Sequence, residues 1–216
     1  NRFEMQRLPK GQLQFLLTRL SLRQLLSAYH NDIQPHQWRF SKGANGRPYV
    51  DRTQSLIEFN LTHTGQHLMI ALTLAGAPGL DAEQSGRSVD AKQVASRYFS
   101  SEEYREIADT PAEYQNTLFL RYWTLKEAAV KATGQGLSIA LRRFSFANPA
   151  KKHFSFIDSQ KLLVDGRDEF KFWSSVQENI VIALCLKHHR SNRAGQIQIE
   201  TRILNWSIAN ASARLS

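Results

Sequence analysis

Apolar residues near the start of the chain recur at helical spacing. Leucine returns every three or four residues from Leu13 to Leu26, which predicts a helix with a broad apolar face over residues 11–29. Two shorter apolar runs, residues 59–63 and 68–74, flank Gly65 and predict two strands joined in a hairpin. The first third of the chain is therefore expected to combine one helix with a small antiparallel sheet.

A stretch of small residues and proline at positions 75–79 interrupts the hydrophobic pattern. Such a composition is typical of connecting segments, so we predict a boundary between two lobes, residues 1–77 and 78–216. A short strand over residues 80–83 is expected to follow it.

Two helices are predicted next, over residues 89–97 and 102–108. Ser100 followed by Glu103 forms a capping-box pattern at the start of the second of them.

The clearest helical signal begins at Thr110. Thr110 suits the N-cap, Pro111 suits the first turn, Glu113 suits a second capping box, and Gly134 suits the stop.

The rest of the chain reads as strands. Four runs fit strand length and composition: residues 154–157, 170–173, 180–186 and 197–203. Helices and strands mix without regular alternation, which predicts an α+β fold rather than a doubly wound sheet.

Composition narrows the function classes only moderately. The 216 residues carry a formal net charge of +9, which favours anionic partners such as nucleic acid, an acidic protein or a phosphate-rich ligand. The single cysteine, Cys185, excludes an internal disulfide and fits a reducing cytoplasm. The chain starts with Asn1 instead of methionine, so we expect part of the native N-terminus to be missing.

Candidate chemistry begins with two acidic residues on the predicted strand 80–83. Asp81 and Glu83 are two positions apart, so their carboxylates face the same way. Facing carboxylates repel each other unless a cation lies between them, and oxygen ligands of this kind suit Mg²⁺. Taken alone, the pair is more often a solvated strand face.

The strong helix supplies a second candidate group. Trp123, Glu127 and Lys131 are spaced four apart and form one stripe, with Lys126 beside it. Taken alone, this is a core tryptophan followed by a surface ion pair. His63, at the end of a predicted strand, is by itself an ordinary structural donor.

The order of these motifs along the chain changes the interpretation. The chain contains Gly46-Arg47-Pro48, Phe59-Asn60-Leu61-Thr62-His63, Gly79-Leu80-Asp81-Ala82-Glu83, Tyr98-Phe99-Ser100 and Trp123-Thr124-Leu125-Lys126-Glu127 with Lys131. This series resembles the Sfp-type 4′-phosphopantetheinyl transferases, from about Leu16 to Leu137. Arg47 stands where that family commonly has lysine, and Thr62 where serine is usual.

The resemblance implies a fold and an activity. The expected fold has two pseudo-twofold-related lobes, each with a small antiparallel sheet and packing helices. The expected reaction is Mg²⁺-dependent transfer of the 4′-phosphopantetheine arm of coenzyme A to a serine of an apo acyl or peptidyl carrier protein, with release of 3′,5′-ADP. The resemblance leaves the pathway open among fatty acid, polyunsaturated fatty acid, polyketide and siderophore synthesis.

The resemblance also implies roles for particular residues. Asp81, Glu83 and Glu127 would hold Mg²⁺, or Mn²⁺ in its place, and Glu127 and Lys131 would be catalytic. The residues expected to contact coenzyme A are Arg47, Thr62, His63, Asp81, Lys126 and Lys131.

The implied partner is an acidic carrier protein, with Arg87, Lys92 and Arg97 as a docking face. We expect a cytoplasmic monomer without membrane or nucleic-acid partners.

Two alternatives stay open at the level of sequence. One is a basic nucleic-acid-binding module, for which the short basic runs at residues 151–154 and 187–190 are the nearest support. The other is a non-catalytic homologue that binds carrier proteins.

Overall fold

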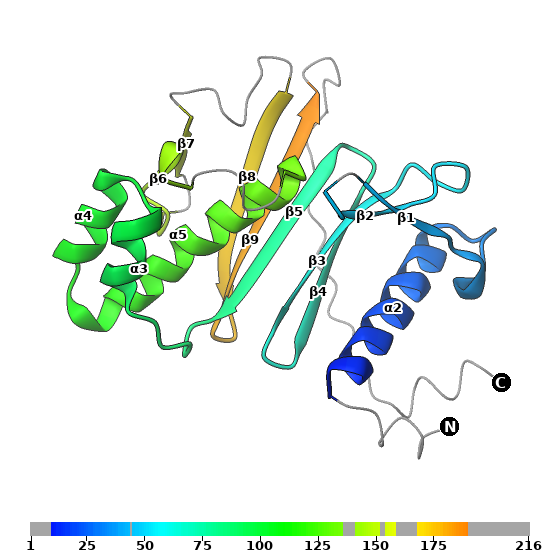
Figure 1. Cartoon of the computed structure of the whole chain (residues 1–216), viewed down its shortest axis with the longest axis horizontal. Coiled ribbons are helices and arrows are strands. Elements are labelled where there is room, and N and C mark those ends of the chain that lie inside the picture. The colour runs from blue at the N-terminus through cyan, green and yellow to red at the C-terminus, as the bar shows by residue number, and fades with distance from the viewer. Residues whose placement is uncertain (1–9, 44, 136–140, 152–153, 159–167, 190–216) are drawn as a thin grey trace. The chain divides into compact units, whose positions relative to one another are not determined.

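The computed structural model of the protein describes residues 10–43, 45–135, 141–151, 154–158 and 168–189 (Figure 1). The chain separates into two compact units, residues 1–38 with 194–216, and residues 39–193. In the first, helix α2 (Lys10–Tyr29) is followed by the 3₁₀ helix η1 (Pro35–Gln37). The buried indole of Trp38 donates to the hydroxyl of Ser27 at 2.9 Å, which holds the chain after η1 against α2.

The second unit contains the remaining elements. They are β1 (Phe40–Lys42), β2 (Pro48–Val50), β3 (Glu58–Thr64), β4 (His67–Thr73), β5 (Ala77–Gln84), α3 (Ala91–Tyr98), α4 (Ser101–Asp109), α5 (Ala112–Thr133), η3 (Leu141–Arg143), β6 (Ser145–Ala147), β7 (Ser155–Ile157), β8 (Asp168–Gln177) and β9 (Ile180–His189). Every strand pairing is antiparallel, in the sheets β1–β2, β3–β4, β5–β9–β8 and β6–β7. The predicted α+β class with small antiparallel sheets is confirmed.

Helix α5 organises the core of this unit. It lies along the β5–β9–β8 sheet, with α3 and α4 packed near its beginning (Figure 1). Most of its residues from Phe119 to Ala132 are buried, among them Leu120, Leu125 and Ala128. This burial against the rest of the unit stabilises a helix of 22 residues.

The start of α5 differs from the prediction. Its N-cap is Pro111, which has no side-chain capping bond, and Thr110 instead ends α4 by donating its hydroxyl to the carbonyl of Glu106 at 2.7 Å. Because α5 begins only two residues after Thr110, that residue serves as the C-cap of α4 and not as the N-cap of α5. The predicted capping box at Ser100 and Glu103 is confirmed, as is the stop at Gly134 in the left-handed conformation.

Other boundaries also shift. Ala77–Gly79, predicted as linker, forms the start of β5, and the predicted lobe boundary at residue 77 stays a prediction. Three short strands were not predicted from the sequence. They are β1 and β2, which form a hairpin around Gly43 and Pro48, and β6. The predicted strand 197–203 lies outside the described residues. Among the described helices, none combines the length and hydrophobicity needed to cross a bilayer.

Candidate functional site

A glycine brings the helical stripe of α5 against β5. A Cβ atom on Gly79 would lie 1.9 Å from the carbonyl oxygen of Ala128 and 2.5 Å from the amide nitrogen of Ala132. Only glycine lets the two backbones approach this closely. Glu127 and Lys131 on α5 consequently lie beside Asp81 and Glu83 on β5.

Lys131 is the direct link between helix and strand. Its Nζ donates to Asp81 Oδ1 at 2.7 Å and to the Leu80 carbonyl at 3.0 Å. Thr62 on β3 joins the same group, because its hydroxyl donates to Asp81 Oδ1 at 3.3 Å. Three of the residues predicted for the site therefore meet, although they come from three separate segments.

The three predicted acidic ligands influence one another electrostatically. Burial raises the pKa of Asp81, and the charge of Lys131 partly offsets that rise. Burial also raises the pKa of Glu127, and the negative charges of Asp81 and Glu83 raise it further. For Glu83 burial raises the pKa, which its ion pair with Arg87 counteracts. Such a group of partly buried acids is unfavourable without added positive charge.

The carboxylates of Asp81, Glu83 and Glu127 suit a hard divalent cation only if oxygen atoms of the substrate complete its coordination shell. Asp81 Oδ2 is buried and has no hydrogen-bond partner within the described part of the chain. Across those same residues, no three acidic, histidine or cysteine side chains are arranged as a ready metal site. Mg²⁺ usually takes one or two carboxylates together with water and phosphate oxygens, so the residues fit that ion as a shared site.

A cavity of about 480 Å³ opens at the end of β3 and β5. Its lining includes His63, Thr64, Glu83 and Arg87. Burial and then the charge of Lys131 lower the pKa of His63, which favours the neutral imidazole. His63 can offer hydrogen bonds to a ligand here.

Polar side chains on β3 bridge to β5 where no strand pairing joins them. Asn60 Oδ1 accepts from the Leu80 amide at 2.9 Å, and Thr64 Oγ1 accepts from the Gln84 amide at 3.0 Å. With Thr62 between them, these residues alternate along one face of β3. Asn60 and Thr64 were not among the predicted site residues, although their alternation with Thr62 on one strand face was the available signal.

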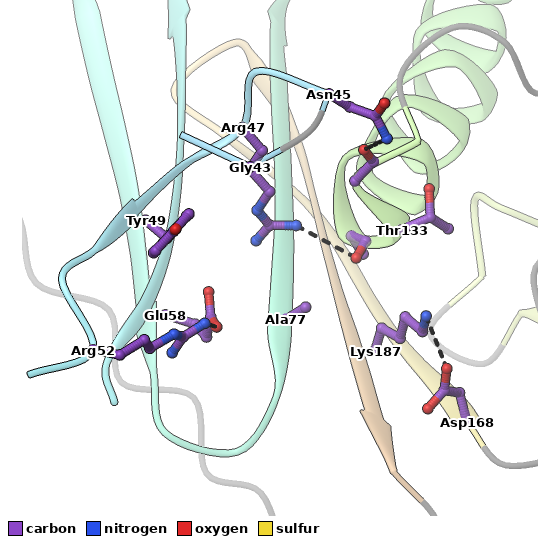
Figure 2. A pocket seen from close by; sticks show the side chains of 12 residues that line it. Gly43, Asn45, Arg47, Tyr49, Arg52, Glu58, Ala77, Thr133, Asp168 and Lys187 are labelled. Atoms are coloured by element: carbon purple, nitrogen blue, oxygen red, sulfur yellow. Dashed lines mark hydrogen bonds and ion pairs between the residues drawn. The ribbon is translucent and has the colours of Figure 1, made fainter. Parts of the chain in front are cut away.

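Arg47 lies in a second cavity, of about 420 Å³ (Figure 2). Its guanidinium donates to main-chain carbonyls, at 2.7 Å to Lys131 and at 2.8 Å to Pro78. The other cations that line this cavity, Arg52 and Lys187, form ion pairs with Glu58 and Asp168.

Lys126 has a structural position. Its side chain is fully buried, and Nζ contacts Glu103 at 2.8 Å and the carbonyls of Leu141 at 2.7 Å and Phe144 at 2.6 Å. These three contacts use all the donors of an ammonium group. These contacts leave no donor of Lys126 for the predicted contact with coenzyme A.

The sequence of this chain was compared with those of known protein families. Residues 77–185 match the model of the 4′-phosphopantetheinyl transferase superfamily. The chain belongs to this superfamily. The matched range contains Asp81, Glu83, Glu127 and Lys131, and it leaves out Arg47, Thr62 and His63.

Curated relatives of this phosphopantetheinyl transferase homologue cover it to different extents. The Synechocystis protein slr0495, whose name assigns it to the 4′-phosphopantetheinyl transferases, is 32% identical over 78% of this chain and 72% of its own length. The 4′-phosphopantetheinyl transferase HetI of Nostoc is 34% identical over 60% of this chain. The chain spans only 55% of the length of HetI.

Among solved structures, holo-[acyl-carrier-protein] synthase of Neisseria meningitidis aligns with a TM-score of 0.44 at 20% identity. That alignment covers 53% of this chain and 98% of the other.

Proposed function

We propose that this protein transfers the 4′-phosphopantetheine arm of coenzyme A to a serine hydroxyl of an apo carrier protein, in a Mg²⁺-dependent reaction that releases 3′,5′-ADP. The observation that supports the proposal is the contact of Lys131 with Asp81 and Thr62, beside Glu83 and Glu127. These residues stand at the motif positions that define the resemblance to the superfamily.

In the proposed reaction the serine oxygen bonds to the phosphorus of the pantetheine phosphate, and the bridging bond to the departing 3′,5′-ADP breaks. Glu127 takes the proton of the serine, directly or through water. Its pKa, raised by burial and by Asp81, brings its basicity closer to neutral pH, as a general base requires.

Other residues bind and orient coenzyme A. The ammonium of Lys131 offsets negative charge on the phosphates, and His63 donates a hydrogen bond. Thr62 holds Asp81 through its hydrogen bond to Oδ1. Asp81, Glu83 and Glu127 are the side chains that would hold Mg²⁺. When bound, the ion neutralises charge that develops on the phosphate oxygens during transfer.

The test is incubation with an apo carrier protein, coenzyme A and Mg²⁺, followed by intact mass measurement. We expect a mass gain equal to one phosphopantetheine arm. A chain that leaves every carrier unmodified but binds RNA tightly would instead support the nucleic-acid alternative, and one that binds carriers unmodified would support the non-catalytic alternative.

A pair of variants on one helix separates the role of the general base from general effects of lost charge. Glu127→Gln should lower turnover by at least about 100-fold while the fold is kept, because it removes the proton acceptor. Glu113→Gln, on the exposed first turn of α5, should leave turnover unchanged. Near-normal turnover of Glu127→Gln with saturating Mg²⁺ would refute the assignment.

A further inference from the structure

Arg47 joins three segments that carry site residues. Besides its short bonds to Lys131 and Pro78, it donates to the carbonyls of Ala132 and Phe59, both at 3.4 Å. Lys131 and Ala132 lie in the last turn of α5, Pro78 lies on β5 and Phe59 lies on β3. We propose that Arg47 is a positioning residue that holds the last turn of α5 against β5, and is not a ligand of the phosphates of coenzyme A.

The end of a helix is a natural place for such a side chain. The last four carbonyls of an α-helix lack partners within the helix, and a cation near them is favourable. Arg47 fills this role for α5 although it lies on a separate hairpin. Burial lowers the pKa of Arg47, but a guanidinium remains charged in proteins.

A second residue of the same hairpin reinforces the contact. Asn45 Nδ2 donates to the carbonyl of Gly134, directly after α5, at 2.9 Å (Figure 2). Gly46, between the two, has φ +77°, a conformation that other residues rarely adopt. The β1–β2 connection is therefore shaped to direct both side chains at the end of α5.

The hydrogen bonds of Arg47 to α5 and β5, here called the clamp, act on both sides of the contact between Lys131 and Asp81. On the helix it holds the carbonyl of Lys131 itself. On the strand it holds Pro78, three residues before Asp81. A shift of about 1 Å in such an arrangement can cost about 100-fold in rate.

Arginine is suited to this task where lysine is not. Its two terminal nitrogens diverge, so that one reaches α5 while the other reaches β3 and β5, whereas lysine has one nitrogen. Both terminal nitrogens of Arg47 already donate to main-chain oxygens, so a phosphate that bound through them would have to break these bonds. A lysine that only supplied charge to a phosphate would be an adequate replacement.

The inference rests on the proposed function, and its experiment compares Arg47→Lys and Arg47→Met with the control Arg39→Met, whose side chain is exposed. We expect both Arg47 variants to lower kcat by about 10-fold or more, with the KM for coenzyme A changed less than about 3-fold. Amide hydrogen exchange at residues 131–135 should become faster in both, and the control should match the parent protein. Near-normal kcat in Arg47→Lys, or a raised KM for coenzyme A with kcat kept in Arg47→Met, would overturn the inference.

The exchange measurement separates this inference from the proposed function. If the parent protein transfers no phosphopantetheine, the function fails, while faster exchange in the last turn of α5 with unchanged affinity for coenzyme A still supports the clamp. Unchanged exchange overturns it. If neither Arg47 variant folds, Asn45→Ala should show the same pattern more weakly, and parent-like turnover and exchange in that variant would contradict the inference.

Discussion

The ammonium group of Lys126 is enclosed by one carboxylate, two carbonyls and the rings of Phe99 and Phe144, at 5.3 and 4.7 Å. Its partner Glu103 is buried as well, and also accepts from the amides of Ser100 and Phe146 at 2.9 Å. Burial lowers the pKa of Lys126 and raises that of Glu103, while each charge favours the ionised form of the other. The pair ties α5 to the start of α4 and to the segment around β6.

Removing one member of this pair should be costly. Lys126→Met leaves the Glu103 carboxylate buried without its cation, and we expect the free energy of unfolding to fall by about 3–5 kcal/mol. Urea denaturation measures this change. Lys92→Met, at an exposed position on α3, should stay within about 0.5 kcal/mol.

The double variant tests whether the two charges are coupled. Lys126→Met with Glu103→Gln should be less destabilised than the sum of the single variants, because no buried charge is left unpaired. A simple sum would show that the pair does not act as a unit.

At the scale of elements, the contact of α5 with β5 decides whether the acidic residues meet. The strand runs close to the helix because position 79 has no side chain. Sequence spacing puts Glu127 and Lys131 on one stripe and Asp81 and Glu83 on one strand face, but only this contact brings stripe and face together.

Gly79→Ala should therefore damage both stability and transfer. The added methyl group would collide with the main chain of α5, and overpacking of this kind typically costs about 1–3 kcal/mol. Urea denaturation and the mass assay measure the two effects. Gly11→Ala is the control because nothing lies within 4 Å of its added atom. Equal stability of the two variants would show that the close approach is not required.

At the scale of the whole molecule, the formal net charge of +9 favours an acidic partner. On the proposed docking helix α3, Lys92 is exposed and Arg97 lies in the last turn. Complementary charge would speed encounter with an acidic carrier protein and orient it.

Added salt should consequently weaken carrier binding more than coenzyme A binding, because exposed charges are screened and partly buried ones much less so. Titrations of each ligand at low and physiological ionic strength measure this. Lys92→Glu should lower carrier affinity, whereas Lys151→Glu, exposed on a different segment, should change it little. Equal salt sensitivity for both ligands would count against the docking face.

Helices, hairpins and caps could be predicted from the sequence where neighbouring residues alone determine them. The helix after residue 10, the β3–β4 hairpin and the Ser100–Glu103 capping box follow from spacing and from short-range hydrogen bonding. Thr110 was assigned to the wrong helix, because its neighbours suit both a helix end and a helix start.

The amino-acid sequence by itself determined the α+β class, the stripe of α5, the acidic face of β5 and the family resemblance. Only the tertiary structure decided how these parts are used. It pairs Lys126 with Glu103 in the interior, and it places the guanidinium of Arg47 at the end of α5. The physical reason is that the partner of a buried cation is set by long-range packing, and residues 47 and 131 meet only when β1, β2 and α5 have assembled.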